Sequence, residues 1–186
     1  RVAAIEMLIK RFVSHYDKKC QIVSLGGGYD TLLFRLHDPF LPFVSSLGHG
    51  LAASLFVDLD YPETCRNKAA IIRNRSELAS VIFRDLSVDS TDKSPTIETA
   101  HYILQPMDLT NRQAMEDFLA TGKVDVTLPT LFLSECVLIY INPDAVNPTL
   151  QYLQSQFTNS CIIVPLNIHF IKCCINTRFH YLKQIR

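Results

Sequence analysis

The sequence has no net charge, no long apolar run and no pair of cysteines or histidines at metal-binding spacing. Zero net charge gives no electrostatic reason to expect a nucleic-acid partner. No stretch approaches the roughly 20 apolar residues that span a membrane, and the first residues do not resemble a signal peptide. The cysteines show no CxxC spacing and sit mostly inside apolar runs. We therefore expect reduced thiols in a cytoplasmic protein without a metal site.

Two further absences concern the ends of the chain. It begins with Arg1 rather than methionine, and its last acidic residue is Asp144. Beyond that point only basic residues carry charge. We therefore expect a piece of a longer protein whose C-terminus is foreign to the fold. The 186 residues are nevertheless enough for one domain with a sizeable core.

The stretch 20–35 is the most informative part of what is present. Residues 21–25 form a short apolar run typical of a buried strand, Gly26, Gly27 and Gly28 interrupt it, and residues 32–35 predict a short helix. A glycine turn of this kind lets the backbone approach a ligand without an intervening Cβ. The N–H groups at the start of the following helix then point at that ligand. An ordinary glycine-rich turn is the alternative.

Strand and helix patterns alternate along the whole chain. Alternation of this kind predicts an α/β fold, in which a parallel sheet has helices on both faces. Residues 37–53 and 85–100 are rich in loop-forming residues and predict loops. The expected strands are 21–25, 54–60, 101–105, 130–138 and 160–164, and the expected helices are 1–16, 32–35, 63–83, 111–121 (with Thr110 as its N-cap) and 143–157.

Acidic residues follow or end several of these strands. Asp58 and Asp60 close the second strand, Asp108 follows the third, and Glu135 interrupts the very apolar fourth. Ligands bind at the carboxyl ends of strands in open α/β sheets, so the order of these residues predicts a small-molecule site. The spacing does not choose between Asp58 and Asp60 as the acceptor for ribose hydroxyls, and a solvated strand-end carboxylate is the alternative for both.

The glycine turn limits which nucleotide is expected there. Gly26 and Gly28 fit the start of a G-x-G-x-x-G dinucleotide fingerprint, but Thr31 stands where the third glycine belongs, and no P-loop lysine follows. S-adenosylmethionine needs only the first part of such a loop and is therefore the better candidate. A nicotinamide dinucleotide remains the alternative.

Several motifs together resemble the leucine carboxyl methyltransferase family. They are LGGGYDT followed by FRL, VDLDYP, MDL and PTLFLSECVLIY, of which the last is the most specific. The resemblance runs from residue 1 to about residue 164. It implies a Rossmann-like class I methyltransferase that uses S-adenosylmethionine. The family includes the enzyme that methyl-esterifies the C-terminal leucine of the protein phosphatase 2A catalytic subunit, and a relative that acts in tRNA wybutosine synthesis.

The resemblance also implies cofactor contacts, one position at a time. Arg1 would meet the carboxylate of the cofactor, Gly26 would lie under its methionine part, and Glu135 would contact it from a strand end. Gly28, in the same loop as Gly26, is a further expected cofactor contact. The ribose and adenine would be bound further along the same edge, by Asp60 (with Asp58 in reserve), Asp108 and Leu109.

The chain departs from the family after its fifth expected strand. Residues 165–186 match none of the family's further strands, so we expect a methyltransferase domain over 1–164, a divergent tail and a sheet without its C-terminal strands. The resemblance identifies no catalytic side chain, which suits the chemistry, because a C-terminal carboxylate is already ionised near neutrality. A truncated non-catalytic product is therefore an alternative to the active enzyme.

Overall fold

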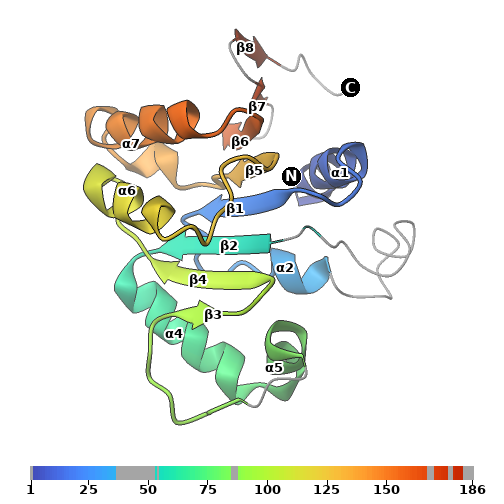
Figure 1. Ribbon diagram of the computed structural model, residues 1–186, viewed down its shortest axis with the longest axis vertical. Helices are drawn as coiled ribbons and strands as arrows, with labels where there is room; N and C mark the ends of the chain where they lie inside the picture. Colours follow the sequence, from blue (N-terminus) through green and yellow to red (C-terminus); the bar gives the residue numbers. More distant parts are fainter. Residues whose placement is uncertain are drawn as a thin grey trace.

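The computed structural model describes residues 2–36, 53, 55–84, 88–166, 170–175 and 178–181, with side chains as far as residue 163. Its centre is an eight-stranded sheet in the order β3-β4-β2-β1-β5-β6-β7-β8. The strands lie side by side from β3 near the lower end of Figure 1 to β8 at its top. The strand bounds are β1 Gln21–Leu25, β2 Leu55–Asp60, β3 Ile97–Glu98, β4 Tyr102–Pro106, β5 Thr130–Leu133, β6 Ser160–Leu166, β7 Phe170–Ile175 and β8 Arg178–Tyr181.

Five neighbouring strands of this sheet are parallel: β4, β2, β1, β5 and β6. These are the five strands that the sequence predicts, so the predicted α/β class with a parallel centre is confirmed. The sequence did not predict β3, β7 and β8, which pair antiparallel at the two edges. The two C-terminal strands continue the sheet within the tail, where the sequence predicts no strand.

Helices cover both faces of the sheet, as the alternating pattern predicts. The bounds of the described helices are α1 Val2–His15, α2 Leu32–Arg35, α4 Pro62–Asn74, α5 Ser76–Phe83, α6 Arg112–Ala120, the 3₁₀ turn η1 Leu138–Tyr140 and α7 Pro143–Gln156. One core cluster joins the sheet to α1, α2, α4 and α5, and a second joins it to α6 and α7.

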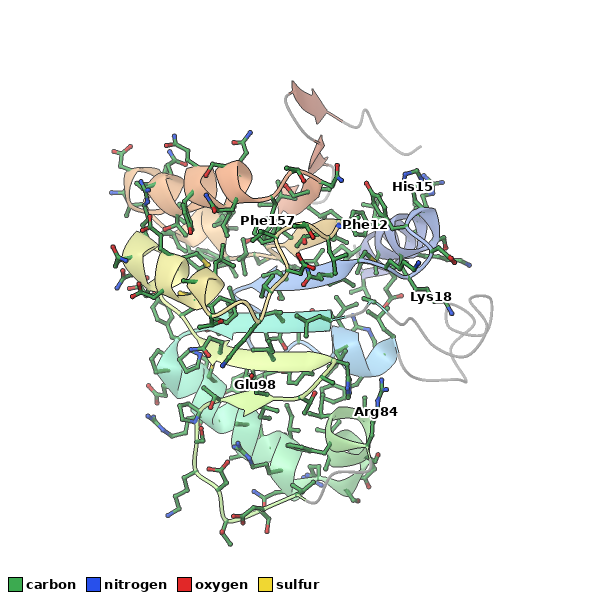
Figure 2. The ribbon with its side chains drawn as sticks, viewed as in Figure 1. Phe12, His15, Lys18, Arg84, Glu98 and Phe157 are labelled. Atoms are coloured by element: carbon green, nitrogen blue, oxygen red, sulfur yellow. The ribbon has the colours of Figure 1, made fainter. Side chains whose placement is uncertain are left out.

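Successive residues of the central strands enter the two clusters in turn. Ile22 packs in the first and Val23 in the second, and Leu131 and Phe132 divide in the same way. Side chains alternate across a strand, so a strand that is buried on both faces must be apolar throughout. Phe157, labelled in Figure 2, follows the last residue of α7. Its ring packs edge-on against Phe132 of β5, with ring centroids 5.1 Å apart.

Three predicted boundaries differ from the observed ones. The single helix expected over 63–83 is broken at Arg75, whose backbone is extended (φ −118°, ψ 110°). The N-cap of α6 is Asn111, whose side chain accepts from the Ala114 N–H, because the Thr110 hydroxyl is donated to Asp108 instead. The fourth predicted strand ends at Leu133, so Glu135 lies in the turn that follows β5 rather than inside a strand.

Other expectations concern the cysteines and the ends of the chain. Cys20, Cys65 and Cys136 form no disulfide, whereas Cys161 is disulfide-bonded, contrary to the expectation of reduced cysteines. Arg1 and most of the loop predicted at 37–53 lie outside the described residues. Within the described part of the chain, no helix is long and apolar enough to cross a membrane.

Candidate functional site

The glycine turn after β1 needs glycine for its backbone geometry. Gly26 (φ 76°) and Gly28 (φ 50°) both have the left-handed conformation that other residues rarely adopt. The turn is also tied to the next strand, since the Gly26 N–H donates to the Leu59 carbonyl at 2.7 Å and the Gly28 N–H donates to Asp60 Oδ2 at 2.7 Å. The turn is therefore held at the carboxyl end of β2.

The position that a Cβ would take on each of the first two glycines is already occupied by protein atoms. A Cβ on Gly26 would lie 2.5 Å from Val137 Cγ2, and a Cβ on Gly27 would lie 2.5 Å from Asp58 Oδ1. Among these three glycines, Gly28 is the one whose Cβ position has no other atom within 4 Å. From the sequence, the glycines are predicted to let a ligand approach the backbone closely. For Gly26 and Gly27 the structure gives a different reason, which is close packing of the turn against Val137 and Asp58.

Asp58 and Asp60 have different environments, although the sequence spacing could not separate them. Asp58 is 3% exposed, and its Oδ2 accepts from Lys68 Nζ at 2.8 Å and from the Tyr102 hydroxyl at 2.8 Å. Burial, reinforced by the Asp58 carboxylate, holds the pKa of Tyr102 well above its ordinary value of 10, so Tyr102 stays a donor at neutral pH. Asp58 is thus part of an internal ion-pair cluster beneath the turn.

Asp60 lies at the rim instead. Its two carboxylate oxygens accept from the backbone N–H groups of Gly28 and Tyr61, each at 2.7 Å. A carboxylate has about four lone-pair sites, so Asp60 can still accept hydroxyl groups from a ligand. These environments favour Asp60 over Asp58 as the ligand-facing acid.

A cavity of about 280 Å³ opens beside the glycine turn. It is bounded by the start of α1, the turn and α2, the segment that follows β5, and β6. The lining residues are Val2, Ile5, Ser24, Gly26, Gly27, Asp30, Leu32, Arg35, Leu133, Ser134, Glu135, Cys136 and Ile163. Ligand pockets usually measure about 300–1,000 Å³, so this cavity suits a ligand fragment the size of an amino acid better than a whole nucleotide.

The charged groups of the lining are two carboxylates and one guanidinium. Arg35 lies between the turn and α1, with its Nε 3.0 Å from Glu6 Oε1 and its Nη1 3.3 Å from Asp30 Oδ1. Its Nη1 also donates to the Thr31 hydroxyl at 2.6 Å. Together, Asp30, Glu135 and Arg35 give the described lining residues a net charge of −1, which favours a ligand with a net positive charge.

The structure brings some of the predicted site residues together and leaves others apart. Gly26 and Glu135 line the cavity, and Gly28 with Asp60 lies beside it. Asp108 and Leu109 follow β4 and are not on the lining. They are linked to the site through the Met107 N–H, which donates to the Asp60 carbonyl at 2.7 Å.

The environments of these last two residues also differ. Leu109 is buried in the core, and Asp108 Oδ1 accepts from the Thr110 N–H at 2.9 Å. Arg1 lies outside the described residues, although its neighbour Val2 lines the cavity. The predicted residues therefore follow one edge of the sheet, from the cavity across β2 to the end of β4, and do not surround one hollow.

Several cavity residues were not identified from the sequence. Asp30 and Arg35 belong to the stretch 20–35 that the sequence singles out, yet no pattern showed that they share a wall with the segment after β5. Ser134 and Cys136 flank Glu135, and only the irregular turn after β5, where Cys136 has φ 57°, places them on the lining. Among the described residues, no group of three possible ligands could hold a metal ion.

Comparison with known proteins identifies related chains. The family model for leucine carboxyl methyltransferases matches residues 1–154. The chain is 33% identical over 170 residues to leucine carboxyl methyltransferase 1 homolog of Arabidopsis thaliana (91% of this chain, 48% of the relative). It is 27% identical over 164 residues to leucine carboxyl methyltransferase 1 of Rattus norvegicus (88% and 46%).

A third relative has a different name. The chain is 30% identical over 169 residues to tRNA wybutosine-synthesizing protein 4 of Homo sapiens, covering 88% of this chain and 23% of that protein. The chain spans about half the length of the leucine carboxyl methyltransferases that it matches. Because the family model covers most of its length, the chain belongs to the leucine carboxyl methyltransferase family.

Proposed function

We propose that this chain is the S-adenosylmethionine-binding part of a carboxyl O-methyltransferase. Its substrate is the C-terminal leucine of the protein phosphatase 2A catalytic subunit. The observation that carries the proposal is the negatively charged cavity where the glycine turn meets the segment containing Glu135, in a chain of this family. S-adenosylmethionine has a sulfonium, an ammonium and a carboxylate, and its net charge of +1 complements the lining.

The size of the cavity suits the amino-acid end of this cofactor. Once that end occupies the cavity, the nucleoside extends along the edge of the sheet, past Gly28 and Asp60 to Asp108 and Leu109. Open space beside Gly28 and the rim position of Asp60 support this path. The proposal keeps Asp58 out of the cofactor contacts, because that carboxylate is already bound by Lys68 and Tyr102.

The reaction requires the methyl donor and the carboxylate to be positioned correctly, and it does not require a general base. When bound, the cofactor supplies an electrophilic methyl group on its sulfonium. A C-terminal carboxyl group has a pKa of about 3.3–3.7 and is an ionised nucleophile at neutral pH. The residues of this chain hold the donor in one orientation and shield it from water. Alignment of two reacting groups can account for roughly 7–11 kcal/mol of a barrier.

Transfer of labelled methyl tests this function. The chain is incubated with methyl-labelled S-adenosylmethionine and a peptide with the phosphatase C-terminal sequence ending in leucine. A peptide identical except for a C-terminal amide is the matched control. We expect base-labile label on the free-acid peptide alone. Equal label on both peptides would contradict carboxyl methylation.

Two observations define the competing functions. The chain covers about half of its relatives, so a product that binds the cofactor without catalysis is the second candidate. Such a product would bind S-adenosylmethionine but would transfer no label to the peptide. The similarity to the human wybutosine-synthesizing protein makes tRNA the third acceptor to test, and label on tRNA but not on the peptide would favour that role.

A further inference from the structure

Two buried hydroxyl groups stand out because they lack a hydrogen-bond partner. Among the described residues, these are the side chains of Ser134 and Thr149, each 1% exposed. Most buried polar groups in folded proteins are hydrogen-bonded, so an exception calls for a physical reason. Ser134 lines the cavity, whereas Thr149 lies on α7 and is not on the lining.

The Ser134 N–H already has a hydrogen-bond acceptor, whereas the Ser134 hydroxyl has no partner. Ser134 follows the last residue of β5, and its N–H donates to the Ile163 carbonyl of β6 at 3.0 Å. The Oγ is shielded from solvent in the structure. A change of χ1 between staggered positions moves this oxygen without moving the backbone. The hydroxyl can therefore turn toward a ligand beside it.

The rest of the lining indicates which ligand group the hydroxyl would meet. Asp30 and Glu135 offer acceptors for a ligand ammonium. Among the described lining residues, donors for a ligand carboxylate are fewer, because the cation Arg35 is already engaged by Glu6, Asp30 and Thr31. The N–H groups of Gly26 and Gly28 are donated within the protein as well. A serine hydroxyl can donate one hydrogen bond.

We propose that the Ser134 hydroxyl is a carboxylate-binding group of this cavity. The inference rests on the proposed function, which supplies two carboxylates: that of the methionine part of the cofactor and that of the C-terminal leucine of the protein substrate. In both cases the O–H donates to a carboxylate oxygen, and the unpartnered state is the state in which that ligand is not bound.

The test compares Ser134→Ala with Thr149→Val, which removes the other unpartnered hydroxyl away from the cavity. Because each change removes a buried polar group that has no partner, both variants should unfold at the same temperature as the parent or higher. If the carboxylate is that of the cofactor, calorimetry with S-adenosylhomocysteine should show a Kd about tenfold weaker for Ser134→Ala and unchanged for Thr149→Val.

Two further binding measurements distinguish the carboxylate of the cofactor from that of the substrate. If the cofactor supplies it, Ser134→Ala binds decarboxylated S-adenosylmethionine as well as the parent does. If the substrate supplies it, S-adenosylhomocysteine binding is unchanged, and a labelled leucine-ended peptide loses affinity whereas its C-terminal amide does not. Unchanged binding of both carboxylates overturns the inference while the proposed function stands. If the parent chain binds no cofactor, both the inference and the proposed function are contradicted.

Discussion

The close packing of Gly27 predicts a large effect from one added methyl group. In Gly27→Ala the new Cβ would lie 2.5 Å from Asp58 Oδ1 and 2.9 Å from Ser24 Oγ, distances that real Cβ atoms do not show. Asp58 cannot yield cheaply, because its other oxygen is held by Lys68 and Tyr102 at 2.8 Å each. Overpacking of this kind costs about 1–3 kcal/mol, and a weakened charged hydrogen bond adds roughly 1.5–3 kcal/mol. We expect a loss of about 3 kcal/mol in the free energy of unfolding.

Gly28→Ala is the matched control within the same turn. No atom lies within 4 Å of its Cβ position, so only the left-handed backbone (φ 50°) opposes alanine, at about 1 kcal/mol. Urea denaturation followed by circular dichroism measures both variants, and equal m-values show that the same transition is compared. If Gly28→Ala proves as destabilising as Gly27→Ala, the explanation by contact with Asp58 is refuted.

Three more predictions use the same cluster and the buried thiols. Lys68→Met should lower the free energy of unfolding by about 3–5 kcal/mol in urea, because it leaves Asp58 buried beside no cation; a loss below 1 kcal/mol would argue against an important pair. Asp60→Ala should weaken S-adenosylmethionine binding by about 1–3 kcal/mol in calorimetry, and a larger effect from Asp58→Asn would reverse the choice between the two acids. Burial raises the pKa of Cys20 to about 11 and that of Cys65 to about 12 from the ordinary 9.0. Because the unfolded thiols ionise first, stability should fall above pH 9 by about 1.4 kcal/mol per pH unit for each thiol, and Cys20→Ala should have a shallower slope.

Apolar periodicity predicts the central part of this fold well. The five parallel strands are buried on both faces, so each is a mostly apolar run that a short window of sequence reveals. The edge strands are different. β3 has two residues, and β7 and β8 are fixed by antiparallel pairing to a neighbour rather than by their own pattern. Pairing across the sheet is a tertiary property that local sequence does not carry.

The candidate site was predicted at its edge but not in its geometry. Gly26 and Glu135, which their strand-end positions single out, both line the cavity. The sequence spacing does not distinguish Asp58 from Asp60, but their tertiary contacts do. Asp58 binds Lys68 and Tyr102, whereas Asp60 binds the glycine turn. The chain leaves β5 at Leu133, five residues before the end of the strand that its apolar composition predicts, and no periodicity shows this.

The central claim is that the cavity beside the glycine turn receives the cofactor, and Cys136 reports on it directly. Cys136 lines the cavity and is half-buried, whereas the free thiols Cys20 and Cys65 are fully buried. The measurement is the rate of N-ethylmaleimide modification at each cysteine, read by mass spectrometry, as S-adenosylhomocysteine is added. We expect the modification rate of Cys136 to fall saturably with ligand concentration, and the rates of Cys20 and Cys65 to stay unchanged. An unchanged rate at Cys136 while the ligand is bound would contradict it.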